Sequence, residues 1–115
     1  METRTIPAEH WVEFFDRFSQ DHVGWPCTIE VQDQQSGPQR LARDLPLMGI
    51  SFDTRGTRPS SVEIIAGDSP RAHVEHVVDL PLVIRKAQEP NGDIDVQIEP
   101  ARGPITLIHL TGPLH

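Results

Sequence analysis

The amino-acid sequence predicts an α+β domain in which an N-terminal amphipathic helix packs on a strongly bent antiparallel sheet, or on a small open barrel, of five to six strands. Apolar side chains near the N-terminus recur at helical spacing. After Gly24 the apolar period changes to two, which is typical of half-buried strands. The 11 prolines also argue against a long helical bundle, because proline breaks helix interiors.

The helix is predicted at about residues 7–21. Pro7 suits the first turn of a helix, and the helix is expected to end before Gly24. Its apolar face follows the spacing i, i+3, i+4, i+7 and consists of Trp11, Phe14, Phe15 and Phe18. Because most of the chain's aromatic side chains lie on this one face, we expect the helix to supply a large share of the core.

Six extended segments follow the helix, each bounded by turn residues. They are predicted at residues 25–33, 41–53, 61–67, 74–88, 93–100 and 104–111. The best alternation is in 93–100, where Ile94, Val96 and Ile98 are separated by polar residues. Short turns join most neighbouring segments, so we expect the strands to be antiparallel.

The string Asp-Leu-Pro-Leu occurs twice, at residues 44–47 and again at residues 79–82. Proline cannot donate to a strand ladder, so each copy is expected to mark a bulge, a corner or an edge. Two strands bent at equivalent points would let the sheet wrap around the helix. The alternative is a chance recurrence of four residues.

The charge and length of the chain bound its function. Residues 1–115 have room for a single domain, with no second core. The net charge of −7 is spread evenly, so it disfavours nucleic acid and anionic membrane surfaces as partners. No apolar run approaches the roughly 20 residues that span a bilayer. The N-terminus lacks the apolar stretch of a secretory signal, and one cysteine cannot form an internal disulfide, so a cytoplasmic location is expected.

Two histidines form the most suggestive chemical motif. His73 and His76 are three residues apart, and Asp68 precedes them. On a helix the two imidazoles would share a face and, with Asp68, could hold a metal ion; on a strand they point to opposite faces. The metalloprotease pattern HExxH is absent. We therefore favour one histidine at a strand end and one bonded near the core, and the metal site remains the alternative.

Two further residues have both a functional and a structural interpretation. Cys27 shares its strand face with Ile29 and Val31, so we expect a buried, inert thiol rather than a nucleophile. Trp25 is a candidate binding residue, because tryptophan is enriched at interface hot spots. It also fits the cap of a core where a helix meets a sheet, which is the more common situation.

The remaining charged groups favour ordinary surface roles. Four arginines near the ends of segment 41–53 would form one patch only if that strand bends strongly: Arg40, Arg43, Arg55 and Arg58. Asp93 and Asp95 are expected to be solvated charges on the outer face of a strand. The sequence contains no glycine-rich phosphate loop and no nucleophile elbow, so it indicates no catalytic residue, metal or cofactor.

Three segments together carry a family pattern. They are Ile-Pro…Trp…Phe-Phe-Asp…Phe-Ser within residues 6–19, Ala-Arg-Asp-Leu-Pro-Leu…Gly-Ile within 42–50, and Gly-Asp…Pro…His…His within 67–76. On these segments the chain resembles a bacterial family of short single-domain proteins of unknown function. The resemblance implies a bacterial origin and a stand-alone domain, and it brings no activity, cofactor or catalytic residue.

A fainter similarity concerns topology alone. A helix followed by bent antiparallel strands is similar to the Sm-like barrel that binds RNA, and residues 47–53 are similar to its glycine-bearing second strand. The chain departs from that family in its acidic charge and in lacking a basic and aromatic base-stacking signature. A shared topology does not imply a shared function.

We therefore expect a non-enzymatic interaction domain that self-associates through a sheet edge or an apolar face, as a homo-oligomer or with a protein partner. The residues that we single out as candidates for binding are His73, His76, Asp68 and Trp25. Two alternatives remain: an Sm-like oligonucleotide-binding module, and a small metal-dependent enzyme that uses His73 and His76.

Overall fold

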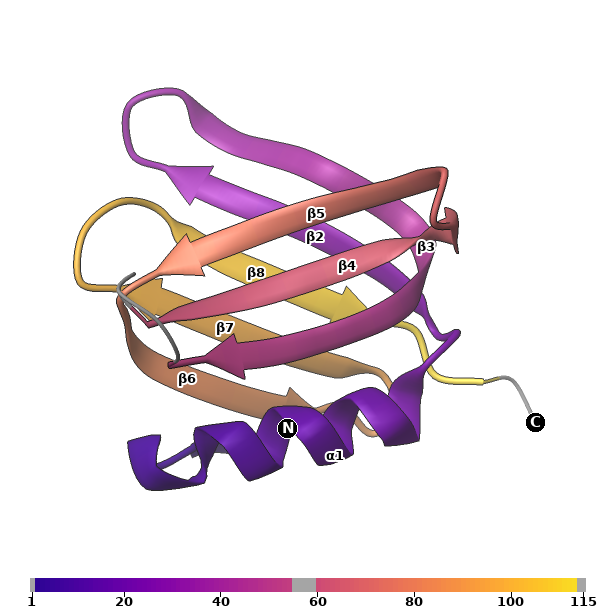
Figure 1. Ribbon diagram of the computed structural model, residues 1–115, viewed down its shortest axis with the longest axis horizontal. Coiled ribbons are helices and arrows are strands. Elements are labelled where there is room, and N and C mark those ends of the chain that lie inside the picture. The colour runs from indigo at the N-terminus through magenta and orange to yellow at the C-terminus, as the bar shows by residue number, and fades with distance from the viewer. Residues whose placement is uncertain (1, 55–59, 114–115) are drawn as a thin grey trace.

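The computed structural model describes residues 2–54 and 60–113, in which one α-helix packs against a large open antiparallel sheet of eight strands (Figure 1). The order across the sheet is β1-β6-β7-β8-β2-β3-β4-β5. The strands are β1 (Glu2–Thr5), β2 (Pro26–Asp33), β3 (Gly37–Asp53), β4 (Ser61–Ser69), β5 (Ala72–Asp79), β6 (Pro81–Gln88), β7 (Ile94–Pro100) and β8 (Ile105–Leu110). The predicted α+β class with an antiparallel sheet is confirmed.

The predicted number of five to six strands is wrong for two reasons. Segment 74–88 is not one strand, because Leu80 takes a positive φ of 51° and turns the chain between β5 and β6. The strand β1 (Glu2–Thr5) has only four residues and no apolar side chain, so it carries no periodic signal. It forms because its backbone pairs with β6, from Glu2 opposite Gln88 to Thr5 opposite Arg85.

The helix begins later than predicted. Pro7 is extended, with ψ of 143°, and a short 3-10 helix, η1 (Ala8–His10), precedes the helix α1 (Trp11–His22). Trp11, Phe15 and Phe18 are buried, whereas Phe14 is only partly buried and lies at the margin of the core. The expectation that this face supplies much of the core therefore holds for three of its four aromatic residues.

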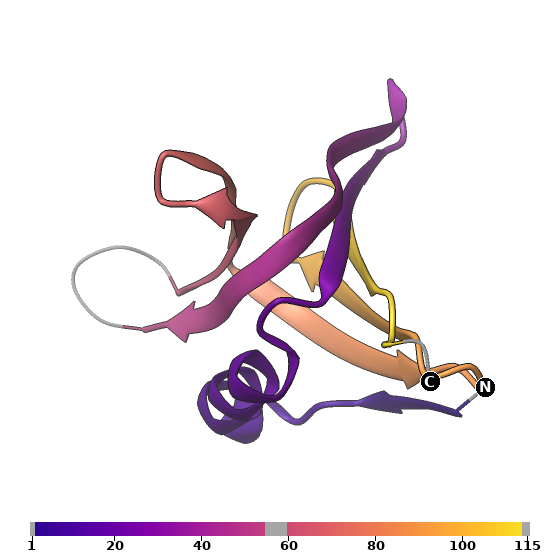
Figure 2. The same ribbon diagram turned by 90° about the vertical axis from the view of Figure 1, so that its right-hand side faces the viewer.

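The helix covers the open side of the folded sheet, between β1 and the C-terminal half of β3 (Figure 2). Two specific contacts fix its position. The Trp11 indole N–H donates to the carbonyl of Ile6 at 2.8 Å. The Ser19 hydroxyl donates to the carbonyl of Ile50 at 2.7 Å and accepts from the same residue's N–H at 2.8 Å. These bonds join α1 to β3 and to the segment that leaves β1.

Both copies of the repeated Asp-Leu-Pro-Leu string lie where the chain bends, as predicted. The positive-φ residues other than glycine in the described part of the chain are Asp44 and Leu80, each at 51°. Around Asp44 the pairing of β2 with β3 shifts register, and β3 then leaves β2 to pair with β4. Around Leu80 the chain turns the corner between β5 and β6. The copies differ in detail, because the left-handed residue is the first of one string and the second of the other.

Cys27 is fully buried on the inner face of β2, which confirms the predicted burial. Burial raises the pKa of its thiol to about 12, so almost no thiolate forms near neutral pH. Among the described residues, no helix is both long and apolar enough to cross a membrane.

Candidate functional site

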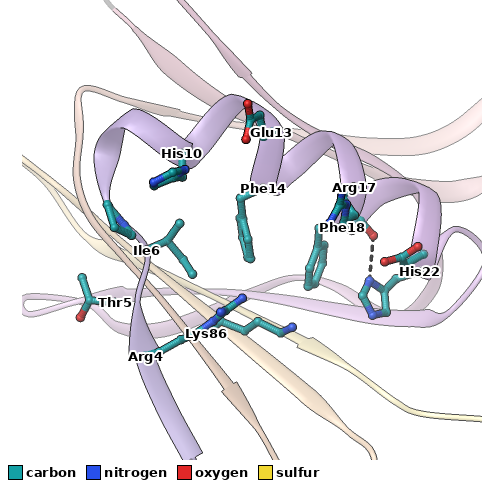
Figure 3. Close-up of a pocket in the computed structure, with 12 residues that line it drawn as sticks. Arg4, Thr5, Ile6, His10, Glu13, Phe14, Arg17, Phe18, His22 and Lys86 are labelled. Carbon is teal, nitrogen blue, oxygen red and sulfur yellow. Dashed lines mark hydrogen bonds between the residues drawn. The ribbon is translucent and has the colours of Figure 1, made fainter.

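A groove of about 550 Å³ lies between α1 and the β1–β6 edge of the sheet (Figure 3). Its apolar lining includes Ile6 from the segment after β1, and Phe14 and Phe18 from α1. The groove exists because β1 stands at the edge of the sheet, where α1 rests mainly on β3 and leaves the space above β6 partly open. Its volume falls within the range of small-molecule sites.

Cationic side chains line this groove from both the sheet and the helix. Arg4 of β1 and Lys86 of β6 are directly opposite in the strand register, and both appear beneath the helix in Figure 3. Arg17 of α1 is a third cation in the lining, and the carboxylates of Glu13 and Asp21 also line it. The Lys86 ammonium lies 5.9 Å from the centroid of the Phe18 ring.

Lys86 occupies an unusual position for a lysine. The alternation of β6 places it on the same face as Ile84, which is fully buried, and its partner in β7 is the fully buried Val96. Burial and the neighbouring Arg4 charge lower the pKa of Lys86, and Asp21 partly opposes this. Across the sheet, the inward-facing positions paired with Lys86 run from Arg4 of β1 to Val96 of β7 and Ile108 of β8. The two cations therefore stand at the end of a row that is otherwise apolar.

His22 lines one end of the groove, and Trp25 packs against it where α1 leads into β2. His22 Nδ1 donates to the carbonyl of Phe18 at 2.7 Å, and its ring lies 4.3 Å from the Phe18 ring. Trp25 packs edge-on against His22 at 4.7 Å and is partly buried against the core. Trp25 thus lies at the margin of the core, where the helix meets the sheet.

A second polar cluster lies on the outer face of the sheet, around His109 of β8. Its Nδ1 is 2.6 Å from Asp95 Oδ1 and 3.8 Å from Glu89 Oε2, and its Nε2 is 3.2 Å from Asp93 Oδ2. Ligand atoms of Glu89, Asp95 and His109 all lie within 4.8 Å of one another. The sequence predicted Asp93 and Asp95 as solvated charges on the outer face, but it gave no sign that His109 pairs with them.

The charges of this cluster are strongly linked. Burial alone would lower the pKa of His109, but the hydrogen bond to Asp95 and the surrounding carboxylates outweigh it and raise the pKa. The charge of Asp95 raises the pKa of Glu89, and a hydrogen bond from the Gly112 N–H lowers the pKa of Asp93. Both ring nitrogens of His109 thus already have carboxylate partners. The cluster joins β8 to β7 and to the turn that precedes β7.

The histidine motif lies on strand β5, where its two imidazoles face opposite sides. His73 is on the outer face, and its Nε2 lies 3.0 Å from Glu75 Oε1. His76 is on the inner face, opposite the buried Ile64, and its Nε2 lies 2.9 Å from the Thr106 hydroxyl of β8. Among the described residues, the group close enough to share a metal ion contains His109 but not His73, His76 or Asp68. The arrangement therefore matches the strand interpretation of this motif.

The hydrogen bond of Glu75 raises the pKa of His73, whereas burial lowers the pKa of His76. The neutral His76 imidazole therefore joins β5 to β8 through its hydrogen bond with Thr106. Of the four arginines near segment 41–53, Arg40 and Arg43 are exposed on β3, and Arg55 and Arg58 lie outside the described residues.

The sequence alone did not reveal the groove. One signal was present: Lys86 is the single lysine of the chain and lies two residues after Ile84, on the same face of an extended segment. The pairing of that strand with β1 was not visible, because the sequence of β1 carries no apolar pattern.

Comparisons with known proteins agree with the family resemblance. The model of a family described as "Family of unknown function (DUF5335)" matches residues 2–115. An "Uncharacterized protein" from Aquifex aeolicus is 34% identical over 55 residues, which are 48% of this chain and 50% of the relative. The match thus spans about half the length of that curated relative. No solved structure matches the chain.

Proposed function

We propose that this chain, which belongs to the DUF5335 family of unknown function, is a non-enzymatic interaction domain that pairs with a second copy of itself along strand β5. The observation that carries this proposal is the position of β5. It is the last strand in the order of the sheet, so one of its edges has no strand partner within the described residues.

The length and composition of β5 suit strand addition. It has eight residues, twice as many as β1 at the other end of the sheet. An unpaired edge of this length presents a row of backbone donors and acceptors that a second strand can satisfy. Exposed apolar side chains accompany it: Val77 is 47% exposed, and Leu80 and Leu82, just beyond the strand, are 47% and 65% exposed.

The charges on the outer face of β5 favour one antiparallel register. In a two-fold pairing centred on His76, His73 of one copy would lie opposite the partner's Asp79, and Glu75 opposite the partner's Val77. Opposite charges directly across an antiparallel pair are stabilising. The raised pKa of His73 supports a charged imidazole at this position in mildly acidic solution.

Light scattering coupled to size exclusion, from micromolar to millimolar protein, tests the association. We expect a dimer that Val77→Asp shifts to monomer, because the variant places a carboxylate in the paired strand. Val12→Asp is the matched control, since Val12 of α1 is also 47% exposed and lies away from β5. A strict monomer at all concentrations, or equal loss of dimer in both variants, would refute the proposal.

A charge exchange tests the register separately. We expect His73→Asp to weaken the dimer, because two carboxylates would then face each other. Adding Asp79→His to the same chain should restore it, since each copy again presents one imidazole and one carboxylate. If the double variant associates no better than His73→Asp alone, the pairing is not centred on His76.

The two alternatives from the sequence have less support. An enzyme built on His73 and His76 would need both imidazoles on one face, and an oligonucleotide module would need a basic surface, whereas the groove cations lie beside Glu13 and Asp21. We also propose that residues 1–115 act as one domain in the cytoplasm. The buried, reduced Cys27 fits that compartment.

A further inference from the structure

We propose that the groove between α1 and the β1–β6 edge binds a small organic monoanion, a carboxylate with an apolar tail. The carboxylate would lie between Arg4 and Lys86, and the tail would lie along Phe14 and Phe18. This site is at the opposite end of the sheet from β5, so it does not depend on self-association.

The arrangement of charges at the groove favours an anion. Arg4 and Lys86 are directly opposite on neighbouring strands, where like charges repel and destabilise the pair. Asp21 lies close enough to influence Lys86, but Arg4 has the larger effect and acts in the opposite direction. An anion between the two side chains would relieve this repulsion.

The apolar surroundings of the cations strengthen their attraction for an anion. The row that ends in Arg4 and Lys86 continues through Val96, Ile108 and Ile29, which are all almost completely buried. A carboxylate held at the margin of such an apolar surface is more weakly solvated than in water, so its attraction to the cations is stronger. Arginine also forms paired hydrogen bonds to both carboxylate oxygens.

The aromatic wall and the net charge of the groove suit a monoanion with an apolar tail. Phe14 and Phe18 stand side by side on α1, with ring centroids 5.5 Å apart, and offer an apolar wall next to the cations. The lining holds three cations, Arg4, Arg17 and Lys86, against the two carboxylates of Glu13 and Asp21. One uncompensated positive charge suits a monoanion. A dianionic phosphate, or a polyanion such as RNA, would meet the two carboxylates.

Titration of the full chain with octanoate by calorimetry tests the proposal, with octanamide as a neutral ligand of the same length. We expect saturable 1:1 binding of octanoate and at least about tenfold weaker binding of octanamide, because an ionic hydrogen bond is worth about a factor of ten or more. Inorganic phosphate alone should bind more weakly than octanoate, since it lacks the tail.

Lys86 offers a direct spectroscopic probe, because it is the single lysine of the chain. Reductive methylation with ¹³C-formaldehyde labels only this side chain and the N-terminal amine. We expect octanoate to shift the Lys86 dimethylamine resonance in proportion to occupancy. The resonance should not move with octanamide.

Variants separate the charge from the fold. Arg4→Gln and Lys86→Met should each weaken octanoate binding about tenfold, and Lys86→Arg should retain it. Arg102→Gln removes an exposed cation that does not line the groove and should leave the affinity unchanged. Circular dichroism of each variant checks that it remains folded.

Three results would overturn the proposal. The first is the absence of saturable octanoate binding up to its solubility limit. The second is equal affinity for octanoate and octanamide, which would show that the groove binds apolar molecules without discriminating by charge. The third is unchanged octanoate affinity in the folded Arg4→Gln and Lys86→Met variants, which would place the anion elsewhere.

Discussion

Arg4 and Lys86 lie directly opposite each other on β1 and β6, and both line the groove beneath α1. Like charges at such positions destabilise an antiparallel pair by roughly 0.2–1 kcal/mol. The lowered pKa of Lys86, caused by burial and by Arg4, shows that the folded protein disfavours the charged ammonium. The folded state thus retains a charge pair that opposes its own stability.

Lys86→Met should therefore stabilise the free protein, because it removes the repulsion and keeps the length of the side chain. We expect the free energy of unfolding near neutral pH to rise by about 0.5 kcal/mol in urea titrations without ligand. The opposing effect is loss of the contact between the ammonium and the Phe18 ring, which at 5.9 Å lies at the limit of a cation–π interaction. A fall in stability would show that this contact outweighs the repulsion.

Phe15→Ala should test the role of the helix in the core. Phe15 is fully buried, so the substitution leaves a cavity and should cost about 3–5 kcal/mol. This is a large part of the about 5–15 kcal/mol that stabilises a typical domain. Urea unfolding measures the loss, and Val12→Ala on the exposed side of the same helix should change stability by less than about 0.5 kcal/mol. Equal effects of the two variants would show that α1 is not docked as described.

His109→Gln should remove a pH-dependent part of the stability. The folded pKa of His109 is raised above its ordinary value of 6.5, despite burial, by Asp95 and the neighbouring carboxylates. The charged imidazole therefore contributes stability that is complete below its unfolded pKa and is lost as pH rises through the folded pKa. We expect the wild-type protein to lose thermal stability between these two values, and the variant to show a flatter profile. Parallel profiles would mean that the carboxylates do not hold the His109 proton.

Leu80→Gly should stabilise the corner between β5 and β6. A left-handed backbone costs a leucine roughly 1–2 kcal/mol, and the extra freedom of unfolded glycine offsets about 0.5–1 kcal/mol. Because the Leu80 side chain is 47% exposed, we expect a net gain of about 0.5 kcal/mol in the free energy of unfolding. Asp79→Gly is the matched control and should lower stability. A loss in Leu80→Gly would show that packing of the leucine exceeds the strain.

The sequence alone determined the parts of the structure that depend on local periodicity. The helical spacing of Trp11, Phe15 and Phe18 and the alternation of Ile94, Val96 and Ile98 predict the helix and β7, because each pattern describes one buried face. The repeated Asp-Leu-Pro-Leu strings predict the two bends for an equally local reason, since proline interrupts a ladder wherever it stands.

Only the tertiary structure decided which distant residues meet. The short strand β1 has no pattern of its own and is extended because β6 offers it a partner, which brings Arg4 to Lys86. Likewise, His109 meets Asp95 because β7 and β8 pair in one register out of several that the same alternation would allow. Register depends on the packing of the whole sheet, so neither the groove nor the carboxylate cluster is contained in any local pattern.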